Sequence, residues 1–389
     1  MRVLFITQTQ DMSGANRSLL QLIKELRSSH GVEPFVVMPR YCIPSAHTMS
    51  SECTANGIPY LLHRMAHFKR QGPLSLGMRI SFVAKHAFSV LYLLWRLRHR
   101  KFDLIHSNTS VTDLGAFVSR WKSVPHLWHL REFGKEDFGL VPSLGTGYEK
   151  WIYGKCERFV AISEAIRKAF LRVIDGSRIT VVHNGILPQP ASLDACHDSP
   201  VIRIAMVGRI EPGKNQMEAL QAIALLKERD AGVPLHLNFI GRIKDEDYHA
   251  RMQQFIREHH LESCVSFMGV RNDVPQLLSQ TDIGLMLSTS EAFGRVTVEF
   301  MMQNVAVIAT DAGANAEIIR HGDSGLLYTL GHPEQLAECL LLLSKRDMLL
   351  RIAQNGKQHA MDNFTSRKNS EKIFAIYKRY TNSSFTYSN

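Results

Sequence analysis

Two glutamates in the second half of the chain, Glu291 and Glu299, have a spacing that suggests chemistry. They enclose Phe293 and Gly294 in the run SEAFGRVTVE, which follows the apolar run DIGLML at 282–287. The apolar run predicts a buried β-strand, and the residues after it predict the start of a helix. A carboxylate accepts hydrogen bonds from sugar hydroxyls, and the free N–H groups at a helix start suit an anion. The pattern therefore indicates a site for a polar, negatively charged ligand.

A basic pair upstream, Arg209 and Lys214, follows a second apolar run in the sequence RIAMVGRIEPGKNQ. Gly208 and Gly213 allow close approach of the backbone to a ligand. The guanidinium and the ammonium are placed to converge on a diphosphate. Taken singly, two glutamates are equally typical of a solvated helix face, and two cations are equally typical of a surface loop. Both motifs in this order favour a binding site.

Apolar, β-branched runs alternate with helical patterns from end to end, which predicts an α/β fold with doubly wound parallel sheets covered by helices. Strands are predicted at 3–7, 34–38, 58–62, 103–106, 125–130, 158–162, 179–182, 201–207, 235–240, 264–267, 283–287, 305–309 and 325–327. Helices are predicted at 17–28, 78–100, 163–173, 215–229, 246–260, 333–344 and 347–361.

The length of 389 residues suggests two domains, because a domain typically has about 100–200 residues. The stretch 185–200 is rich in Pro, Ala, Ser and Asp without any period, which is typical of a linker. We expect an N-terminal Rossmann-like domain at 1–190 and a second one at 198–365. A C-terminal helix within 366–389 is expected to return to the first domain and to end in a frayed polar tail at 381–389.

Together these motifs resemble the family 4 glycosyltransferases, which are retaining, nucleotide-sugar-dependent enzymes with the GT-B fold of two Rossmann-like domains facing a cleft. The resemblance spans essentially the whole chain. It includes SGANRS at 13–18, IHSNTS at 105–110, ISEAIRKAF at 162–170, VVHNGI at 181–186, VGRIEPGKN at 207–215, SEAFGRVTVEFM at 290–301, DAGANAEII at 311–319 and GDSGLLY at 322–328. It implies transfer of a sugar from a UDP- or GDP-linked donor to a glycan or lipid-linked acceptor, as in bacterial-type cell-surface polysaccharide synthesis.

The resemblance also assigns roles to residues of the second half. Glu299 would accept hydrogen bonds from the donor ribose. Arg209 and Lys214 would bind the diphosphate and stabilise the charge that develops as the nucleoside diphosphate leaves. The donor sugar would be held by Glu291 together with the backbone of Phe293, Gly294 and Arg295.

In the first half, the resemblance assigns donor binding to Gly14, in the loop after the first strand and facing the cleft. It assigns a catalytic role to His129, at the end of PHLWHLR and close to the donor sugar and the acceptor. A lone histidine on a strand is as often a hydrogen-bonded core residue, so both interpretations of His129 stay open. His106 and His126 are interpreted as structural.

Two departures from the family pattern concern the acceptor side. The first loop commonly reads Gly-Gly-Ala-Glu in the family, whereas here Ser13-Gly14-Ala15-Asn16 lacks the carboxylate. The acid that often follows the histidine is displaced, since the strand continues Leu130-Arg131-Glu132. Both departures put the identity of the acceptor in doubt rather than donor binding.

No metal or cofactor is expected. Asp245-Glu246-Asp247 superficially resembles a metal-binding Asp-x-Asp, but acids at a predicted helix start favour the helix dipole. Arg209 and Lys214 would neutralise the diphosphate instead.

The family retains the anomeric configuration by same-face attack, in which the leaving phosphate takes the acceptor proton. The Gly-bearing run 138–147 is interpreted as a loop that lines the acceptor cleft.

The net charge of +10 is concentrated in one segment. Residues 53–102 hold nine Lys and Arg and no Asp or Glu, whereas residues 200–365 are net negative. No nucleic-acid-binding motif accompanies the charge, so we expect no nucleic-acid partner. The apolar helix at 78–100 either packs on a sheet or lies at a membrane surface, because its uninterrupted run, Ala87 to Trp95, is short for a span. Peripheral contact of 53–102 with an anionic membrane is the hypothesis.

The cysteines and the N-terminus suggest a cytoplasmic protein, peripheral at most on the inner membrane face. Six scattered cysteines without any C-x-x-C pair fit a reducing compartment, and the apolar run VLFI is too short for a signal peptide.

Two alternatives to a transferase stay open. One is a catalytically silent scaffold subunit that binds a nucleotide sugar, and the other is a GT-B epimerase, which the glutamate pair disfavours.

Overall fold

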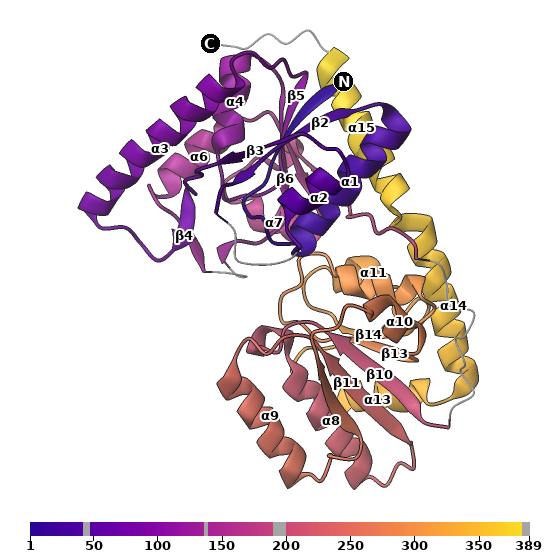
Figure 1. The fold of residues 1–389 in the computed structure, drawn as a ribbon. Helices are drawn as coiled ribbons and strands as arrows, with labels where there is room; N and C mark the ends of the chain where they lie inside the picture. The colour runs from indigo at the N-terminus through magenta and orange to yellow at the C-terminus, as the bar shows by residue number, and fades with distance from the viewer. Residues whose placement is uncertain (42–46, 136–138, 190–199, 383–389) are drawn as a thin grey trace. The chain divides into compact units, whose positions relative to one another are not determined.

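The computed structural model describes residues 1–41, 47–135, 139–189 and 200–382. The chain forms two compact units, which are treated separately: unit 1 is Met1–Gly185 together with the chain from Ser366 onward, and unit 2 is Ile186–Thr365 (Figure 1). Ile186 belongs to unit 2 because its N–H donates to the carbonyl of Phe364 at 2.8 Å. Most of the predicted linker, at 190–199, and most of the predicted tail, at 383–389, lie outside the described residues.

Unit 1 is built on a parallel sheet of seven strands in the order β3-β2-β1-β5-β6-β8-β9. The strands are β1 (Arg2–Ile6), β2 (Glu33–Pro39), β3 (Tyr60–His63), β5 (Leu104–Ser107), β6 (His126–Leu130), β8 (Arg158–Ala161) and β9 (Ile179–Val181). Side chains of β1 alternate between the two faces. Val3 and Phe5 join one buried cluster and Leu4 and Ile6 join another, as the two-residue period of a strand requires.

Helices cover both faces of this sheet. Helices α1, α2 and α15 pack over the face of Val3, whereas α3 and α4 pack over the face of Leu4. The helices of unit 1 are α1 (Gly14–His30), α2 (Met49–Ala55), α3 (Leu76–Leu97), α4 (Leu114–Lys122), α6 (Thr146–Gly154), α7 (Glu164–Phe170), the 3-10 turn η1 (Gly176–Arg178) and α15 (Ser366–Asn382). Helix α15 lies along α1, where the rings of His30 and Phe374 stack at 4.2 Å (Figure 1).

Unit 2 repeats this plan with six parallel strands in the order β12-β11-β10-β13-β14-β15. The strands are β10 (Ile202–Val207), β11 (Leu235–Ile240), β12 (Val265–Gly269), β13 (Ile283–Met286), β14 (Ala306–Thr310) and β15 (Leu326–Tyr328). The helices are the 3-10 turn η2 (Pro212–Lys214), α8 (Gln216–Glu228), α9 (Glu246–Glu258), α10 (Val274–Ser279), α11 (Arg295–Met302), α12 (Asn315–Ile318), α13 (Pro333–Leu343) and α14 (Arg346–Asn363).

Each sheet contains a point at which the strand order reverses. It falls between β1 and β5 in unit 1 and between β10 and β13 in unit 2. Ligands of open α/β sheets bind at the carboxyl ends of the strands beside such a point. The residues that follow β10 and β13 are the two motifs that the sequence singles out.

One interpretation of the sequence is wrong at this level. Part of the run 138–147, interpreted as a loop, is strand β7 (Leu140–Pro142), which pairs antiparallel with β4 (Lys69–Gln71), and α6 begins at Thr146. Each strand of this pair has three residues, and its partner lies about seventy positions away in the sequence. Such short strands carry no alternation that a local pattern could detect.

Helix α3 carries apolar residues on both its buried and its exposed sides. His86, Val90, Leu93 and Leu97 form a buried stripe, while its outer side is both apolar and exposed. With 22 residues and a mean hydropathy of 1.2 over its most apolar window, it is long and apolar enough to cross a membrane by length and composition alone. The helix is thus longer than the run from Ala87 to Trp95 indicates, and its buried stripe holds it on the sheet of unit 1.

Candidate active site

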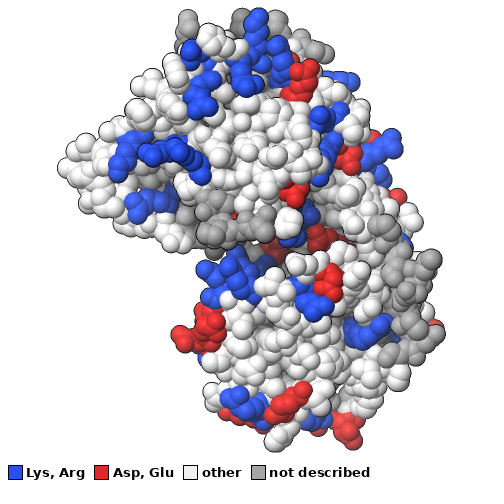
Figure 2. Space-filling model, viewed as in Figure 1, with Lys and Arg blue, Asp and Glu red and all other residues white. Residues whose placement is uncertain are grey.

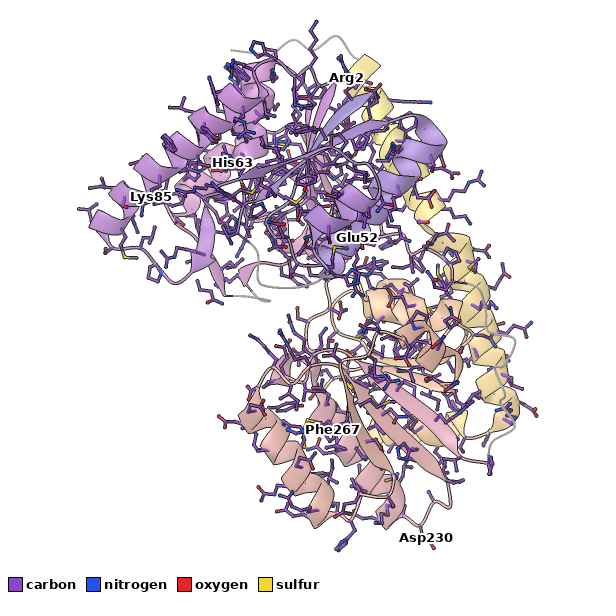
Figure 3. All side chains as sticks on the ribbon, viewed as in Figure 1. Arg2, Glu52, His63, Lys85, Asp230 and Phe267 are labelled. Carbon is purple, nitrogen blue, oxygen red and sulfur yellow. The ribbon has the colours of Figure 1, made fainter. Side chains whose placement is uncertain are left out.

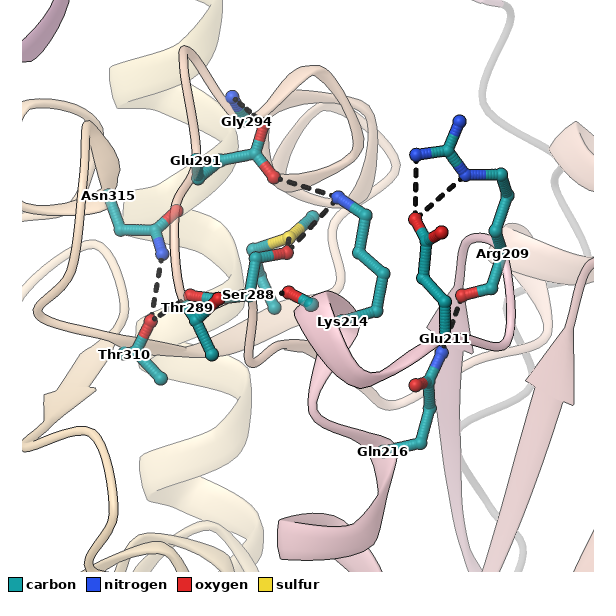
Figure 4. Close-up of polar contacts among 12 residues, drawn as sticks. Arg209, Glu211, Lys214, Gln216, Ser288, Thr289, Glu291, Gly294, Thr310 and Asn315 are labelled. Atoms are coloured by element: carbon teal, nitrogen blue, oxygen red, sulfur yellow. Dashed lines mark hydrogen bonds and ion pairs between the residues drawn. The ribbon is translucent and has the colours of Figure 1, made fainter. Parts of the chain in front are cut away.

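Two loops at the point of reversal in unit 2 bring the two motifs together. One loop runs from Gly208 to Asn215 after β10, and the other runs from Leu287 to Gly294 after β13. Lys214 Nζ donates to Ser288 Oγ at 3.1 Å and to Glu291 Oε2 at 3.2 Å (Figure 4). An ammonium has three N–H donors, and two of them are committed to these contacts. The third can reach a ligand without breaking the lysine's own bonds.

The carboxylate of Glu291 is fixed from both sides. Its Oε1 accepts from the N–H of Gly294 at 3.1 Å, while Oε2 receives the lysine. The side chains of Glu291 and Lys214 are 16% and 27% exposed, so the pair is sheltered yet open to solvent. A partly exposed ion pair of this kind can exchange partners when a charged ligand arrives, because water screens its own attraction.

Two glycines let the backbone take the shape that this carboxylate needs. Gly294 has φ 85° directly before α11, in the left-handed region that other residues avoid. Gly313, at φ 62°, lies against the loop, and a Cβ there would be 2.4 Å from the carbonyl oxygen of Glu291. The next residue, Ala314, donates its N–H to that same carbonyl at 2.8 Å. The position of Glu291 therefore depends on a close contact between two loops.

Three buried polar residues, Ser288, Thr310 and Asn315, brace the site. The sequence did not single out Ser288 or Thr310. Thr310 Oγ1 donates to the carbonyl of Ser288 at 3.1 Å, and Asn315 Nδ2 donates to Thr310 Oγ1 at 3.3 Å. All three side chains are buried. Asn315 belongs to DAGANAEII, whose place after a strand was the available signal. Nothing in the spacing indicates that Thr310, the last residue of β14, joins the two loops.

Arg209 does not reach Lys214 in this structure. Its Nε and Nη2 contact Glu211 Oε1 at 2.8 Å and 2.6 Å, and its side chain is 48% exposed. Figure 4 shows this pair on the far side of the lysine from Glu291. The carboxylate of Glu211, two residues along, was visible in the sequence as a competitor for the guanidinium. Convergence of Arg209 on a diphosphate would require it to leave Glu211.

The other residues that the sequence predicts to bind the donor lie in helix α11 or directly before it. Glu299 Oε1 accepts from Arg295 Nη2 at 3.1 Å, one turn along the helix. The Phe293 side chain is buried and meets the ring of Phe364 edge-on at 6.1 Å, so only its backbone is available to a ligand. Among the described residues, no side chain caps the N-terminus of α11, whereas at the start of α8 the N–H of Met217 donates to the hydroxyl of Tyr248 at 2.8 Å. The free N–H groups at the start of α11 suit an anion.

The first loop of unit 1 is held by the residue that departs from the family pattern. Asn16 is buried, accepts from Thr7 Oγ1 at 2.5 Å, and donates to the carbonyls of Thr9 and Asp11 at 3.0 Å and 2.7 Å. Gly14 is the exposed first residue of α1. The amide at position 16 thus closes the loop after β1, a task that needs both a donor and an acceptor and that a carboxylate could not perform.

His129 is wholly buried near the carboxyl end of β6. Its Nδ1 lies 3.1 Å from Nε2 of His106, whose Nδ1 lies 2.5 Å from the hydroxyl of Tyr377 on α15. Arg131 Nη2 also points at Nδ1 of His129, at 3.4 Å. Burial, reinforced by the positive charge of Arg131, lowers the pKa of both His106 and His129 well below the usual range. Tyr377 could not be found from sequence because it lies 271 positions from His106.

Two acidic motifs have local structural tasks. Glu132, the displaced acid, accepts through Oε1 from Thr109 Oγ1, from Ser110 Oγ and from the N–H of Ser110, at 2.7–2.9 Å. It therefore braces the loop after β5. Asp245 caps α9 by accepting from the N–H of Tyr248 at 2.8 Å, as acids at a helix start are expected to do.

Two parallel-sheet units with ligand-binding loops at the strand ends define the GT-B architecture, and comparison with known proteins agrees with this assignment. A family described as "Glycosyltransferase Family 4" matches residues 12–189, and one described as "Glycosyl transferases group 1" matches residues 197–359. The chain belongs to the family 4 glycosyltransferases.

Characterised relatives differ in what they act on. The chain is 31% identical to the N-acetyl-alpha-D-glucosaminyl L-malate synthase of Bacillus anthracis over 42% of its own length, and that match spans only 41% of the relative. It is 21% identical to the UDP-Gal:alpha-D-GlcNAc-diphosphoundecaprenol alpha-1,3-galactosyltransferase of Escherichia coli, over 74% of this chain and 78% of that one. Identity at this level shows kinship between the chains.

Among solved structures, HepE of Anabaena in complex with UDP and glucose has a TM-score of 0.77 and 24% identity, covering 97% of this chain and 100% of that chain. The lipopolysaccharide outer core galactosyltransferase WaaB, in its apo form, has a TM-score of 0.73 and 16% identity, covering 97% and 100%. These likenesses establish the shared GT-B fold.

Proposed function

We propose that this chain is a retaining hexosyltransferase that moves a sugar from a UDP- or GDP-linked donor to a glycan or lipid-linked acceptor, in cell-surface polysaccharide synthesis. The observation that carries the proposal is the cluster of Lys214, Ser288 and Glu291 between two helix starts. It joins a cation for a phosphate to a carboxylate for sugar hydroxyls within one sheltered pair of loops.

The cluster suggests how the chain would assist departure of the nucleoside diphosphate. Lys214 would turn its third N–H toward the phosphate oxygens, and Arg209 would leave Glu211 to join it. Both cations would stabilise the negative charge that grows as the bond from sugar to phosphate breaks. Because the guanidinium of Arg209 is itself about half exposed in this ion pair, exchanging Glu211 for a diphosphate costs little.

The same arrangement supports transfer without a metal and with retention. Two cations and the uncapped start of α11 would supply positive charge at the diphosphate. In a same-face attack, the departing phosphate oxygen takes the proton of the acceptor hydroxyl while the acceptor oxygen bonds to the anomeric carbon. Glu291 would then orient the sugar, and no separate carboxylate nucleophile is required.

A donor screen tests the proposal. UDP- and GDP-linked sugars are offered in calorimetry, beginning with UDP-glucose because the similar HepE protein has been seen in complex with it. We expect one base series to bind, Glu299→Ala to weaken that binding tenfold or more, and Glu317→Ala to leave it unchanged. Binding and turnover unaffected by Glu299→Ala would contradict the roles assigned here. Nucleotide binding with no turnover of any donor would favour the silent scaffold.

We further propose that the protein is cytoplasmic and that its acceptor side meets an anionic membrane through α3. Its outer side exposes Leu76, Met78, Ile80, Val83, Phe88, Leu91, Tyr92 and Trp95. Cations surround this apolar side, and residues 53–102 hold no acid to offset them. Figure 2 shows blue and white atoms without red over α3, and Lys85 lies on its outer side in Figure 3. A second copy of the chain would bring like charges together, so an anionic lipid surface fits better.

Vesicle sedimentation tests this contact. Each basic residue near an anionic surface contributes roughly 1 kcal/mol, so reversing Arg79 and Lys85 to Glu should weaken binding at least about tenfold. The same charge change at Lys372 and Lys378 on α15 is the control and should weaken it less. Binding should fall when anionic lipid is omitted and when salt is raised. Equal sedimentation with anionic and zwitterionic vesicles would contradict the proposal.

A further inference from the structure

A line of hydrogen-bonded side chains crosses unit 1 from its C-terminal helix to the end of β6. It runs from the Tyr377 hydroxyl to His106 Nδ1 at 2.5 Å, and from His106 Nε2 to His129 Nδ1 at 3.1 Å. All three side chains are buried. Among the residues that the structure describes, none supplies a hydrogen-bond partner for the last atom of the line, His129 Nε2.

Each imidazole in this line carries a single proton. Burial and the nearby Arg131 disfavour the charged form of both rings and lower both pKa values well below the usual range. A neutral imidazole has one N–H and one lone pair. The hydrogen bonds must therefore all point the same way along the line, from Tyr377 toward His129 or in reverse.

Arg131 decides the direction, because a guanidinium can only donate. It points Nη2 at Nδ1 of His129, and its other nitrogens are held by Asn108 and Asn184. A proton on that Nδ1 would face the positive guanidinium, whereas a lone pair would attract it. At the opposite end, burial raises the pKa of Tyr377 well above its usual range, so the phenol keeps its proton and can donate it.

We propose that Tyr377 and His106 are positioning residues that lock His129 in the tautomer with its proton on Nε2. The Tyr377 hydroxyl donates to His106 Nδ1, His106 Nε2–H donates to His129 Nδ1, and His129 Nε2–H remains as a donor. This donor lies near the carboxyl end of β6, on the edge of the parallel sheet at which ligands of open α/β sheets bind.

The tautomer determines what His129 can do. With its lone pair committed to His106, the ring cannot act as a general base through Nε2. It offers an N–H to an acceptor oxygen, such as a hydroxyl of the donor or acceptor sugar, and this part rests on the proposed function. An unpaired buried donor destabilises the free protein, and a ligand oxygen would remove that cost on binding.

Long-range ¹H–¹⁵N NMR of the histidine rings tests the tautomer on the free, full-length protein. We expect His129 to show a protonated Nε2 and an unprotonated Nδ1 at pH 7, with His106 the same, and a spectrum of His129→Gln identifies the signals. A proton on Nδ1 of His129, or an imidazolium at pH 7, would overturn the proposal. Because no substrate is involved, this result stands whether or not the proposed transferase activity is found.

Two variants test the positioning role. Tyr377→Phe removes the donor to His106, so a second tautomer population should develop at both rings. Tyr153→Phe deletes another buried hydroxyl of unit 1, which donates to the carbonyl of Ser110, and should leave both rings unchanged. Identical histidine spectra for Tyr377→Phe and the natural chain would refute the role of Tyr377.

Where turnover is measurable, substitutions at His129 distinguish its role as a hydrogen-bond donor from a role as a general base. Gln can place an N–H near the position of Nε2, whereas Phe cannot donate. We expect His129→Gln to keep turnover within about tenfold and His129→Phe to lose a further tenfold or more. Equal loss in both variants, together with loss of the acidic limb of the pH–rate profile, would indicate a general base and contradict the proposal.

Discussion

The two units both carry polar side chains toward the carboxyl ends of parallel strands, but in opposite states. In unit 2, Lys214 and Glu291 are charged, partly exposed and paired with each other. In unit 1, His106 and His129 are neutral, wholly buried and held in a line that ends on α15. The charged pair can exchange partners when a diphosphate arrives, whereas the histidines present one fixed atom. Unit 2 is therefore suited to binding a charged group, whereas unit 1 is suited to making a hydrogen bond from a fixed position.

Among the changes that test this contrast, removing the ammonium of Lys214 should have the largest effect, which is on nucleotide binding. We expect Lys214→Ala to weaken binding of UDP, or of GDP if that is the base recognised, by about 10- to 100-fold, since a charged hydrogen bond contributes about 1.5–3 kcal/mol. Binding of the free nucleoside, which lacks a diphosphate, should change much less. Calorimetry with both ligands measures the difference.

The matched control for this variant is Lys345→Ala, which removes an exposed cation of unit 2 between α13 and α14. If both variants weakened nucleotide binding equally, the charge of the unit rather than the cluster would be responsible. If Lys214→Ala weakened nucleoside and nucleotide alike, the lysine would hold the loops rather than the diphosphate.

Substitution of two glycines should have the next largest effect. Comparing the two variants separates the cost of backbone strain from the cost of a steric clash. Gly313 and Gly322 both have positive φ, at 62° and 77°. An alanine Cβ at Gly313 would lie 2.4 Å from the Glu291 carbonyl, whereas at Gly322 it would meet nothing within 4 Å. Both variants should lose about 1–2 kcal/mol of unfolding free energy from strain.

Only Gly313→Ala should also weaken nucleotide-sugar binding, because it displaces the loop that carries Glu291. Urea unfolding and calorimetry on the two variants give the comparison. Unchanged affinity in Gly313→Ala would show that the exact position of Glu291 is unimportant, and the pair would then recognise charge alone.

What the sequence could predict follows the same division between units. Lys214 and Glu291 stand in short loops directly after strands, so strand–loop–helix patterns located them and the resemblance assigned their roles. The sequence analysis expects the C-terminal helix to return to the first domain, but no local pattern indicates that Tyr377 is the residue of α15 that meets His106. Arg209 was placed in the correct loop, but its pairing with Glu211 depends on rotamers, which spacing does not determine.

Acid should affect unit 1 through its buried histidines, and this last prediction concerns the stability of the unit rather than its ligand binding. Burial lowers the pKa of His126 to about 3 and that of His63 to about 4, while both titrate near 6.5 in the unfolded chain. The unfolded state therefore binds more protons below pH 6.5. Stability is fully present above that pH and is lost as pH falls toward 4, by about 1.4 kcal/mol per pH unit for each histidine.

Tryptophan fluorescence isolates this effect, because all four tryptophans, at 95, 121, 128 and 151, belong to unit 1. Urea midpoints between pH 7 and pH 5 should fall less steeply for His126→Gln than for the natural chain, since glutamine takes up no proton. His99→Gln, at an exposed position, should keep the natural slope. Parallel slopes for all three proteins would mean that His126 is already protonated in the folded state, and the neutral, buried character of the unit 1 histidines would then need revision.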